Sequence, residues 1–250
     1  MNVLAVLRDP CFSPHSVAKD EAILKAVVRQ LEERGCRVSV VSEQALTVPF
    51  PPDIVLSMGR HDETLRRLKA MGVRCINAPE AVGRCRRSTL QTIMQEAGIP
   101  IPPQEGTSGY WLKRGDSAAA MMPGDVVFAA ETATLQQLQQ GFRQRGITDM
   151  VVSAHVEGDE LKFYGVRGTG FFRFFYADEE ASHYAFSVEA LCETAERLAA
   201  AVGLEVYGGD CIVRQDGTFC IIDFNDWPSF SRCREEAAAA IAERVLRVKE

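Results

Sequence analysis

Two apolar runs meet at Asp216-Gly217, and the second run ends in Asp223, Phe224 and Asn225. An Asp-Gly pair between runs rich in apolar and β-branched residues is the strongest short-range signal for a β-hairpin with a two-residue turn. Counting outward from such a turn places Asp210 opposite Asp223. Side chains alternate between the faces of a strand, so Asn225 points to the same side as Asp223. The sequence therefore predicts a hairpin that gathers three oxygen-bearing side chains on one patch.

The opposed carboxylates of this hairpin need a compensating charge. At about 5 Å and an effective dielectric constant of about 20, two like charges cost roughly 3 kcal/mol. A hard divalent cation with carboxylate and amide ligands offsets that repulsion. We therefore predict a magnesium site, with Mn²⁺ as the alternative ion, at Asp210, Asp223 and Asn225. Two alternatives stay open: the carboxylates are solvated charges at a strand end, or a one-residue bulge shifts the register and separates them.

The composition excludes several classes of partner. Lys and Arg number 28, Asp and Glu number 34, and the net charge is −6, so nothing global favours nucleic acid or an anionic membrane. The N-terminal apolar run is too short for a signal peptide, and no stretch approaches a membrane span. The 8 cysteines show neither a C-x-x-C pair nor zinc spacing, which is typical of reduced thiols in a cytoplasmic protein. We expect small-molecule substrates. The sequence does not indicate whether the protein is a monomer or an oligomer.

Apolar runs and amphipathic helices alternate through the first part of the chain. This βαβ pattern predicts a small parallel sheet. The expected strands are 3–7, 37–41, 53–57 and 73–76, and the expected helices are 18–34, 63–71 and 87–97.

The second part of the chain has more strands than helices, which predicts an α+β C-terminal half in an α/β protein. The expected strands are 110–114, 125–129, 150–152, 161–167 and 170–176, followed by the Asp-Gly hairpin, and the expected helices are 134–144, 187–202 and 234–248. The predicted domains are an N-terminal α/β domain (1–97), a Pro-rich linker (98–104), a central subdomain (105–155) and a C-terminal subdomain with the metal site (156–250).

The motifs that are absent narrow the chemistry. The chain has no Walker P-loop, no G-x-G-x-x-G after a strand and no G-x-S-x-G, which removes the commonest nucleotide-binding and serine-hydrolase signatures. Lys113 lies in an apolar strand that would bury its stem while the ammonium group reaches a polar cavity and a phosphate. A surface lysine fits the same pattern equally well. The glycine-containing loop 115–125 follows, and its backbone amides could fold over phosphates.

A polar segment begins at His155, where another predicted strand ends. Exposed backbone between strands can hydrogen-bond an adenine edge, and Glu160 could bind ribose hydroxyls; a plain polar turn is the alternative. Lys162 and Arg173 lie on neighbouring predicted strands. With Lys113 they would form the local basic cluster that the acidic chain otherwise lacks.

This order of parts resembles the ATP-grasp superfamily over most of the chain. The most specific feature is an acidic residue on one strand followed by an acidic-x-Asn sequence on the next, matched here by Asp210, Asp223 and Asn225. In that superfamily these positions hold magnesium on ATP. The second acidic residue is usually Glu in the ligases, so Asp223 resembles the inositol polyphosphate kinases of the superfamily instead. The resemblance implies an ATP-grasp fold, in which central and C-terminal subdomains with mixed or antiparallel sheets follow the parallel βαβ domain.

The resemblance also implies roles for individual residues. Lys113 matches the strand lysine that contacts ATP phosphates, and Glu160 matches the acid that binds ribose. The residues that match the adenine-binding hinge are Ser153, Ala154, His155 and Val156. Ser153 stands where Glu or Gln is common, so the adenine contact there would be mainly to backbone. An earlier basic position of the superfamily falls only loosely on Arg86-Arg87-Ser88.

The expected activity is an ATP- and magnesium-dependent carboxylate–amine ligation through an acyl phosphate. Phosphoryl transfer needs mostly positioning and charge neutralisation, and Lys162 and Arg173 would supply positive charge for the transferred group. One alternative is a kinase for a small-molecule hydroxyl, such as that of an inositol phosphate. Another is a nucleotide-binding regulator without turnover.

Three arginines are candidates for binding the acceptor. Arg60 follows the third predicted strand, at the edge where open α/β sheets bind ligands. Arg232 and Arg234 follow the metal strand, where the superfamily often places substrate-binding residues. Solvated arginines are the alternative interpretation.

Overall fold

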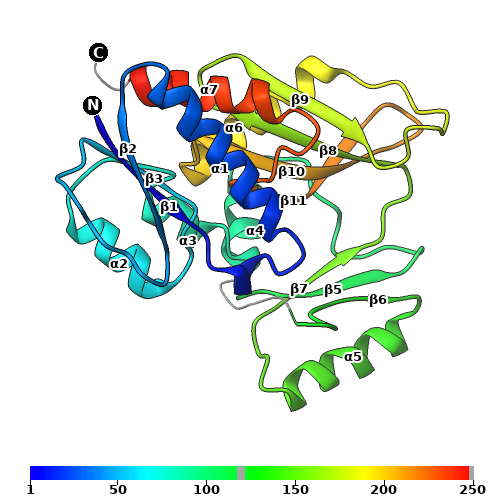
Figure 1. Ribbon diagram of the computed structural model, residues 1–250. Coiled ribbons are helices and arrows are strands. Elements are labelled where there is room, and N and C mark those ends of the chain that lie inside the picture. The colour runs from blue at the N-terminus through cyan, green and yellow to red at the C-terminus, as the bar shows by residue number, and fades with distance from the viewer. Residues whose placement is uncertain (117–121, 248–250) are drawn as a thin grey trace.

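The structure is a computed structural model that describes residues 1–116 and 122–247 (Figure 1). The predicted phosphate loop 115–125 includes residues 117–121, which lie outside the described residues. The same holds for residue 248, at the end of the predicted C-terminal helix.

A four-stranded parallel sheet with the strand order β2-β1-β3-β4 forms the N-terminal part. Its region contains β1 (Asn2–Leu7), the short 3-10 helix η1 (Pro10–Phe12), α1 (Val17–Glu32), β2 (Arg37–Ser42), β3 (Ile54–Ser57), α2 (Asp62–Ala70), β4 (Cys75–Ile76), α3 (Pro79–Arg84) and α4 (Arg87–Glu96). Val3 and Ala5 pack in a core cluster with α1, while Leu4 and Val6 pack in another with Leu68 of α2. Because both faces are covered, β1 is a continuous apolar run.

A three-stranded antiparallel sheet, order β6-β5-β7, forms the central part. Its elements are β5 (Tyr110–Arg114), β6 (Val126–Ala129), α5 (Thr132–Gln144) and β7 (Met150–Ala154). Leu112 on β5 packs against Leu135 and Phe142 of α5. Residues alternate along a strand, so Trp111 and Lys113 lie on the face away from α5. Figure 1 shows α5 on the outer side of this sheet.

A four-stranded antiparallel sheet, order β11-β10-β8-β9, forms the C-terminal part. Its region contains β8 (Asp159–Val166), β9 (Phe171–Tyr176), α6 (Val188–Val202), β10 (Val206–Val213), β11 (Phe219–Asp226) and α7 (Arg234–Leu246). Leu161 and Phe163 pack with α6 on one face, and Tyr164 and Val166 pack with α7 on the other. This architecture confirms the predicted fold class, whereas the predicted domain boundaries stay predictions. No helix in the described part of the chain is long and apolar enough to cross a bilayer.

Helices α1 and α7 join the N-terminal and C-terminal sheets. They lie side by side (Figure 1), and Val27 and Leu31 of α1 share one core cluster with Ile241 and Val245 of α7. The same cluster contains Val3 of the parallel sheet and Val206 of the antiparallel one, and all of these side chains are fully buried. The two sheets are therefore packed on a common core.

The Asp-Gly hairpin differs from the expected register. The Arg214 amide donates to the Thr218 carbonyl (2.8 Å), so three residues form the loop instead of the expected two, and Gly217 takes the left-handed conformation (φ 79°) that such a loop needs. Cys211 then pairs with Ile221, not with Ile222 as a two-residue loop would require. A one-residue bulge at Ile222 restores the pairing of Asp210 with Asp223. The predicted pairing is confirmed, although the bulge has an effect opposite to the one considered from the sequence.

Helix α3 was not expected from the sequence. It has six residues, too few to show a helical repeat of apolar positions. Pro79 is its first residue, a position at which proline is favoured because its missing amide would have no helical partner.

The side chain of Asn77 connects the parallel sheet to β10. Its Oδ1 accepts from the amides of Glu205 (2.7 Å) and Val206 (2.9 Å), and its Nδ2 donates to the Val206 carbonyl (2.7 Å). Asn77 is 1% exposed, so water cannot easily replace these bonds.

We predict that Asn77→Ala lowers the free energy of unfolding by about 3 kcal/mol, because it leaves buried backbone groups without partners. The measurement is chemical denaturation, and the slope of the unfolding free energy against denaturant concentration should stay unchanged. The control is Gln136→Ala on the exposed face of α5, which should change the free energy by less than about 0.5 kcal/mol. A similar small effect in both variants would contradict the role of Asn77.

Candidate functional site

Two adjoining pockets share Asp223 and Arg87 as wall residues. The first lies between the central and C-terminal sheets and measures about 490 Å³, counting its open mouth. It is lined by Arg87, Leu90, Gln91, Met94, Ile101, Pro102, Lys113, Val151, Ser153, Ile221, Ile222 and Asp223. The second opens toward the parallel sheet and measures about 810 Å³ on the same basis. It is lined by Phe12, Arg60, Asp62, Leu65, Val82, Gly83, Cys85, Arg86, Arg87, Asp223, Asn225 and Asp226.

The first pocket combines apolar walls with one half-buried lysine, Lys113. Leu90 and Met94 come from α4, and Ile221 comes from β11. Lys113 reaches across from β5, and its Nζ donates to the carbonyl of Ile222 (3.1 Å). Ile222 is the bulged residue of β11, so the bulge provides the carbonyl that holds the ammonium group. Burial lowers the pKa of Lys113, and the nearby charge of Asp223 opposes that shift. The pocket suits a flat apolar ring that carries an anionic group.

The three predicted metal ligands lie on one face of the hairpin. Asp210 is paired with Asp223, and Asn225 is paired with Gly208, which has no side chain to cover the patch. The Nζ of Lys162 lies 2.6 Å from Asp210 Oδ1. Burial raises the pKa of Asp210; Lys162 opposes this shift and the charge of Asp223 adds to it. The donors are hard oxygens with excess negative charge, so they fit a magnesium ion.

The predicted adenine-binding hinge is only partly in the pocket. Ser153 lines it. The amides of Ala154 and His155 are already used, since they donate to the carbonyls of Pro103 (2.7 Å) and Gly109 (2.8 Å). Within residues 1–116 and 122–247, no hydrogen bond involves the amide of Val156.

Glu160 was predicted to bind ribose, and it lies near the start of β8. It is exposed and stands opposite Ile212 of β10. It does not line the first pocket.

The two predicted catalytic cations occupy different surroundings. Lys162 lies beside the predicted metal ligands through its contact with Asp210. Arg173 is on β9, the far edge of the sheet, and pairs with Glu236 of α7 (2.5 Å). Arg173 lines neither pocket.

The three predicted substrate arginines are not clustered. Arg60 lines the second pocket. Arg232 pairs with Glu179 (2.7 Å) and donates to the Tyr176 carbonyl (3.2 Å), outside both pockets. Arg234 is the first residue of α7 and also lies outside them.

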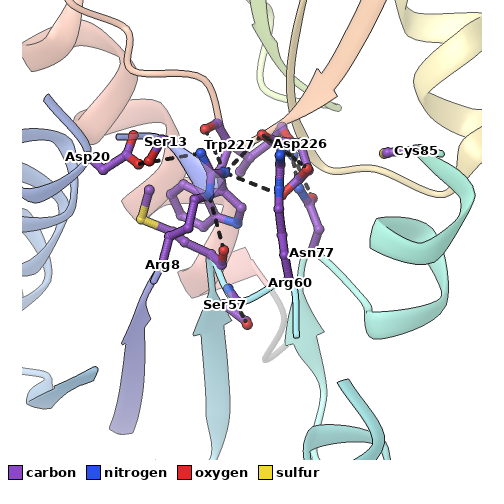
Figure 2. Close-up of polar contacts among 12 residues, drawn as sticks. Arg8, Ser13, Asp20, Ser57, Arg60, Asn77, Cys85, Asp226 and Trp227 are labelled. Atoms are coloured by element: carbon purple, nitrogen blue, oxygen red, sulfur yellow. Dashed lines mark hydrogen bonds and ion pairs between the residues drawn. The ribbon is translucent and has the colours of Figure 1, made fainter. Parts of the chain in front are cut away.

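A buried carboxylate, Asp226, organises the base of the second pocket (Figure 2). Arg60 lies 2.5 Å from its Oδ1, and Arg8 lies 3.5 Å from its Oδ2. Burial alone would raise the pKa of Asp226, but the two guanidinium groups hold it below its usual range. Arg8 also donates to the backbone carbonyls of Asp226 (3.3 Å) and Trp227 (3.2 Å). These contacts fasten the end of β11 to the parallel sheet.

Sequence reasoning missed Arg8 and Asp226 as site residues. The available signal was positional: Arg8 directly follows β1, and Arg60 follows β3, its neighbour in the parallel sheet. Parallel strands end at the same edge, where open α/β sheets bind ligands. Nothing in the sequence showed that Asp226, more than 200 residues after Arg8, would be brought to that edge.

Arg86 and Arg87 also belong to the site, although the sequence suggested them only loosely. Both line the second pocket. Arg60 Nε and Arg86 Nε are buried and have no hydrogen-bond partner among the described residues. Both residues line the second pocket, so its walls contain unpaired guanidinium nitrogens.

No protein-family model and no curated protein matches the chain by sequence, whereas solved structures match over nearly its whole length. D-alanyl-alanine synthetase A from Vibrio cholerae is similar at a TM-score of 0.72 and 12% identity, with 99% of this chain and 96% of that chain covered. A RimK-domain ATP-grasp protein from Sphaerobacter thermophilus is similar at 0.64 and 18%, with 96% and 98% covered. The ATP-grasp ligase PsnB, in complex with the precursor peptide PsnA2 and AMPPNP, is similar at 0.64 and 16%, with 99% and 97% covered. The chain has the ATP-grasp fold.

Proposed function

We propose that this protein is an ATP- and magnesium-dependent enzyme that joins a small-molecule or peptide carboxylate to an amine through an acyl phosphate. The observation that carries the proposal is the shared wall of the two pockets at Asp223 and Arg87. A nucleotide in the first pocket and an acceptor in the second would meet there. The names of the similar D-alanyl-alanine synthetase and of the PsnB ligase support the choice of ligation.

The first pocket would bind ATP. Its apolar walls would hold adenine, and the unused amide of Val156 and the side chain of Ser153 are available near the hinge. Lys113 would exchange its bond with the Ile222 carbonyl for an ATP phosphate, which keeps the buried charge paired. Glu160 stays our prediction for the ribose.

Asp210, Asp223 and Asn225 would hold magnesium, which neutralises phosphate charge during transfer. Lys162 would remain beside Asp210 and limit the negative charge of the ligand set. Arg87 lines both pockets and would contact the transferred group. We therefore favour Arg87 over Arg173 for neutralising charge on the transferred group. The role of Arg173 stays a prediction.

The second pocket would bind the acceptor as an anion. Arg60 and Arg86 each have an unused buried Nε there, and unpaired donors in a pocket favour a ligand that accepts hydrogen bonds. A carboxylate fits these donors, and its oxygen would then face the nucleotide across Asp223. Arg232 and Arg234 stay predictions for a more distant part of the acceptor.

We predict that Lys113→Met weakens ATP binding by removing the half-buried ammonium group while keeping the apolar stem. The measurement is the increase in melting temperature produced by millimolar ATP with magnesium, because a ligand of the folded state stabilises it by mass action. The control is Lys25→Met on the exposed face of α1, where the lysine side chain is 80% exposed. If ATP with magnesium did not raise the melting temperature of the unmodified protein, the proposal of nucleotide binding would be rejected.

We predict that Asp223→Asn and Asn225→Ala each reduce magnesium-dependent turnover of ATP by about 10³-fold, because the metal loses a ligand at the point of transfer. Asp223→Asn should leave the free protein folded and at least as stable, since it removes repulsion with Asp210. Asp178→Asn, on the exposed loop after β9, is the matched control. Near-normal activity of Asp223→Asn would disprove the metal assignment.

We predict that hydroxylamine will intercept the reaction as a hydroxamate. An acyl phosphate is a mixed anhydride that hydroxylamine attacks, whereas a phosphate ester does not react in this way. The protein is incubated with γ-labelled ATP, a mixture of metabolites and hydroxylamine, and the label should appear as free phosphate. Asp223 gives the kinase alternative its support, and label on a stable ester would establish that alternative. ATP binding without any acceptor-dependent turnover would instead favour the regulator.

A further inference from the structure

Asp9, Cys11 and His61 bring three different metal-binding atoms together beside the second pocket. His61 Nε2 lies 3.0 Å from Asp9 Oδ2 and 4.0 Å from Cys11 Sγ, and the three ligand atoms all lie within 4.8 Å of one another. The loop after β1 provides Asp9 and Cys11, and the segment between β3 and α2 provides His61. Both segments leave the same edge of the parallel sheet.

The contacts do not form a nucleophilic relay. In a Cys–His–Asp relay the thiol and the carboxylate contact opposite nitrogens of the imidazole ring. Here both are nearest to the same nitrogen, Nε2. Convergence on one point is what a shared ion requires. Zinc bonds of about 2.0–2.3 Å in tetrahedral geometry separate neighbouring donor atoms by about 3.3–3.7 Å, a range that the observed spacings bracket.

Surrounding residues hold the cluster in place. The buried carboxylate of Glu43 accepts from the amide of Asp9 (3.0 Å) and from the amide of His61 (2.5 Å), so one side chain fixes both ligand-bearing segments. Gln44 donates to Asp9 Oδ2 (2.8 Å). The Phe12 ring meets the His61 ring edge-on, with 4.7 Å between centroids. Such outer contacts orient ligands in metal sites.

We propose that Asp9, Cys11 and His61 bind one zinc-class divalent ion, with the fourth position left to solvent or a small ligand. Thiolate and imidazole ligands favour zinc over magnesium, so this site differs chemically from the oxygen site at Asp210, Asp223 and Asn225. The ion would connect the loop after β1 with the loop after β3. Because Phe12 and Arg60 line the second pocket, it would also steady that pocket.

The test is a titration of the reduced, metal-free protein with Co²⁺ and then Zn²⁺, in excess Mg²⁺ to occupy the oxygen site. We expect one Co²⁺ per chain, with tetrahedral absorption and a thiolate charge-transfer band that Zn²⁺ abolishes. Cys11→Ala should remove the charge-transfer band, and His61→Ala should prevent tetrahedral binding. Gln44→Ala should weaken binding by about 10-fold, as the loss of an outer partner does.

The matched controls are Cys192→Ser on α6 and His15→Ala in the loop before α1, which lie outside the cluster. Both should bind Co²⁺ like the unmodified protein, and circular dichroism should show every variant folded. An unmodified protein without a charge-transfer band would overturn the proposal. So would a band that survives Cys11→Ala or disappears in Cys192→Ser. These readouts need no turnover, so they stand apart from the proposed ligation.

Discussion

The neutralisation of one buried carboxylate holds the site together. Asp226 is the last residue of β11 and is 1% exposed, where an unpaired charge would be strongly destabilising. Arg8 and Arg60 supply the opposite charges from the ends of two neighbouring parallel strands. Burial lowers the pKa of Arg8, and Arg60 adds to that shift, so the three groups depend on one another. Their attraction places the end of β11 against the parallel sheet, and the second pocket lies at that junction.

The bulge in β11 serves two purposes in the same strand. It restores the pairing of Asp210 with Asp223 after a loop that is one residue longer than expected. It also leaves Ile222 unpaired, and the Ile222 carbonyl accepts from Lys113 of the central sheet. A bulge is a common device for redirecting groups near functional sites. Here it explains how a regular antiparallel hairpin can present two carboxylates on one side and a carbonyl acceptor to a second sheet.

The two pockets differ in the charged side chains that line them. The first has Lys113 among mostly apolar walls, the second has Arg60 and Arg86, and Arg87 lines both. Asp223 lies between them and is shared by both. The proposed zinc-class site lies beyond the second pocket and uses softer donors, so the two metals would not compete. The proposals for the two pockets and for the zinc-class site therefore rest on different donor groups. An experiment could reject one of them and leave the others standing.

The sequence by itself determined the order and type of most elements, because apolar periodicity and turn residues are local properties. It also predicted the Asp210–Asp223 pair, although from a two-residue loop that the structure replaces with a three-residue loop and a bulge, and it predicted Lys113 on a strand. The sequence did not predict the three-residue loop or the compensating bulge, because they depend on how Asp216 and Thr218 bond within the turn.

Arg173, Arg232 and Arg234 were predicted for the site from their types and positions, but their side chains lie outside both pockets. Only the tertiary structure brought Arg8, Arg60 and Asp226 together, and likewise Asp9, Cys11 and His61. Such contacts join segments that are distant in sequence, and the packing of the sheets on a common core, which no local pattern encodes, decides them.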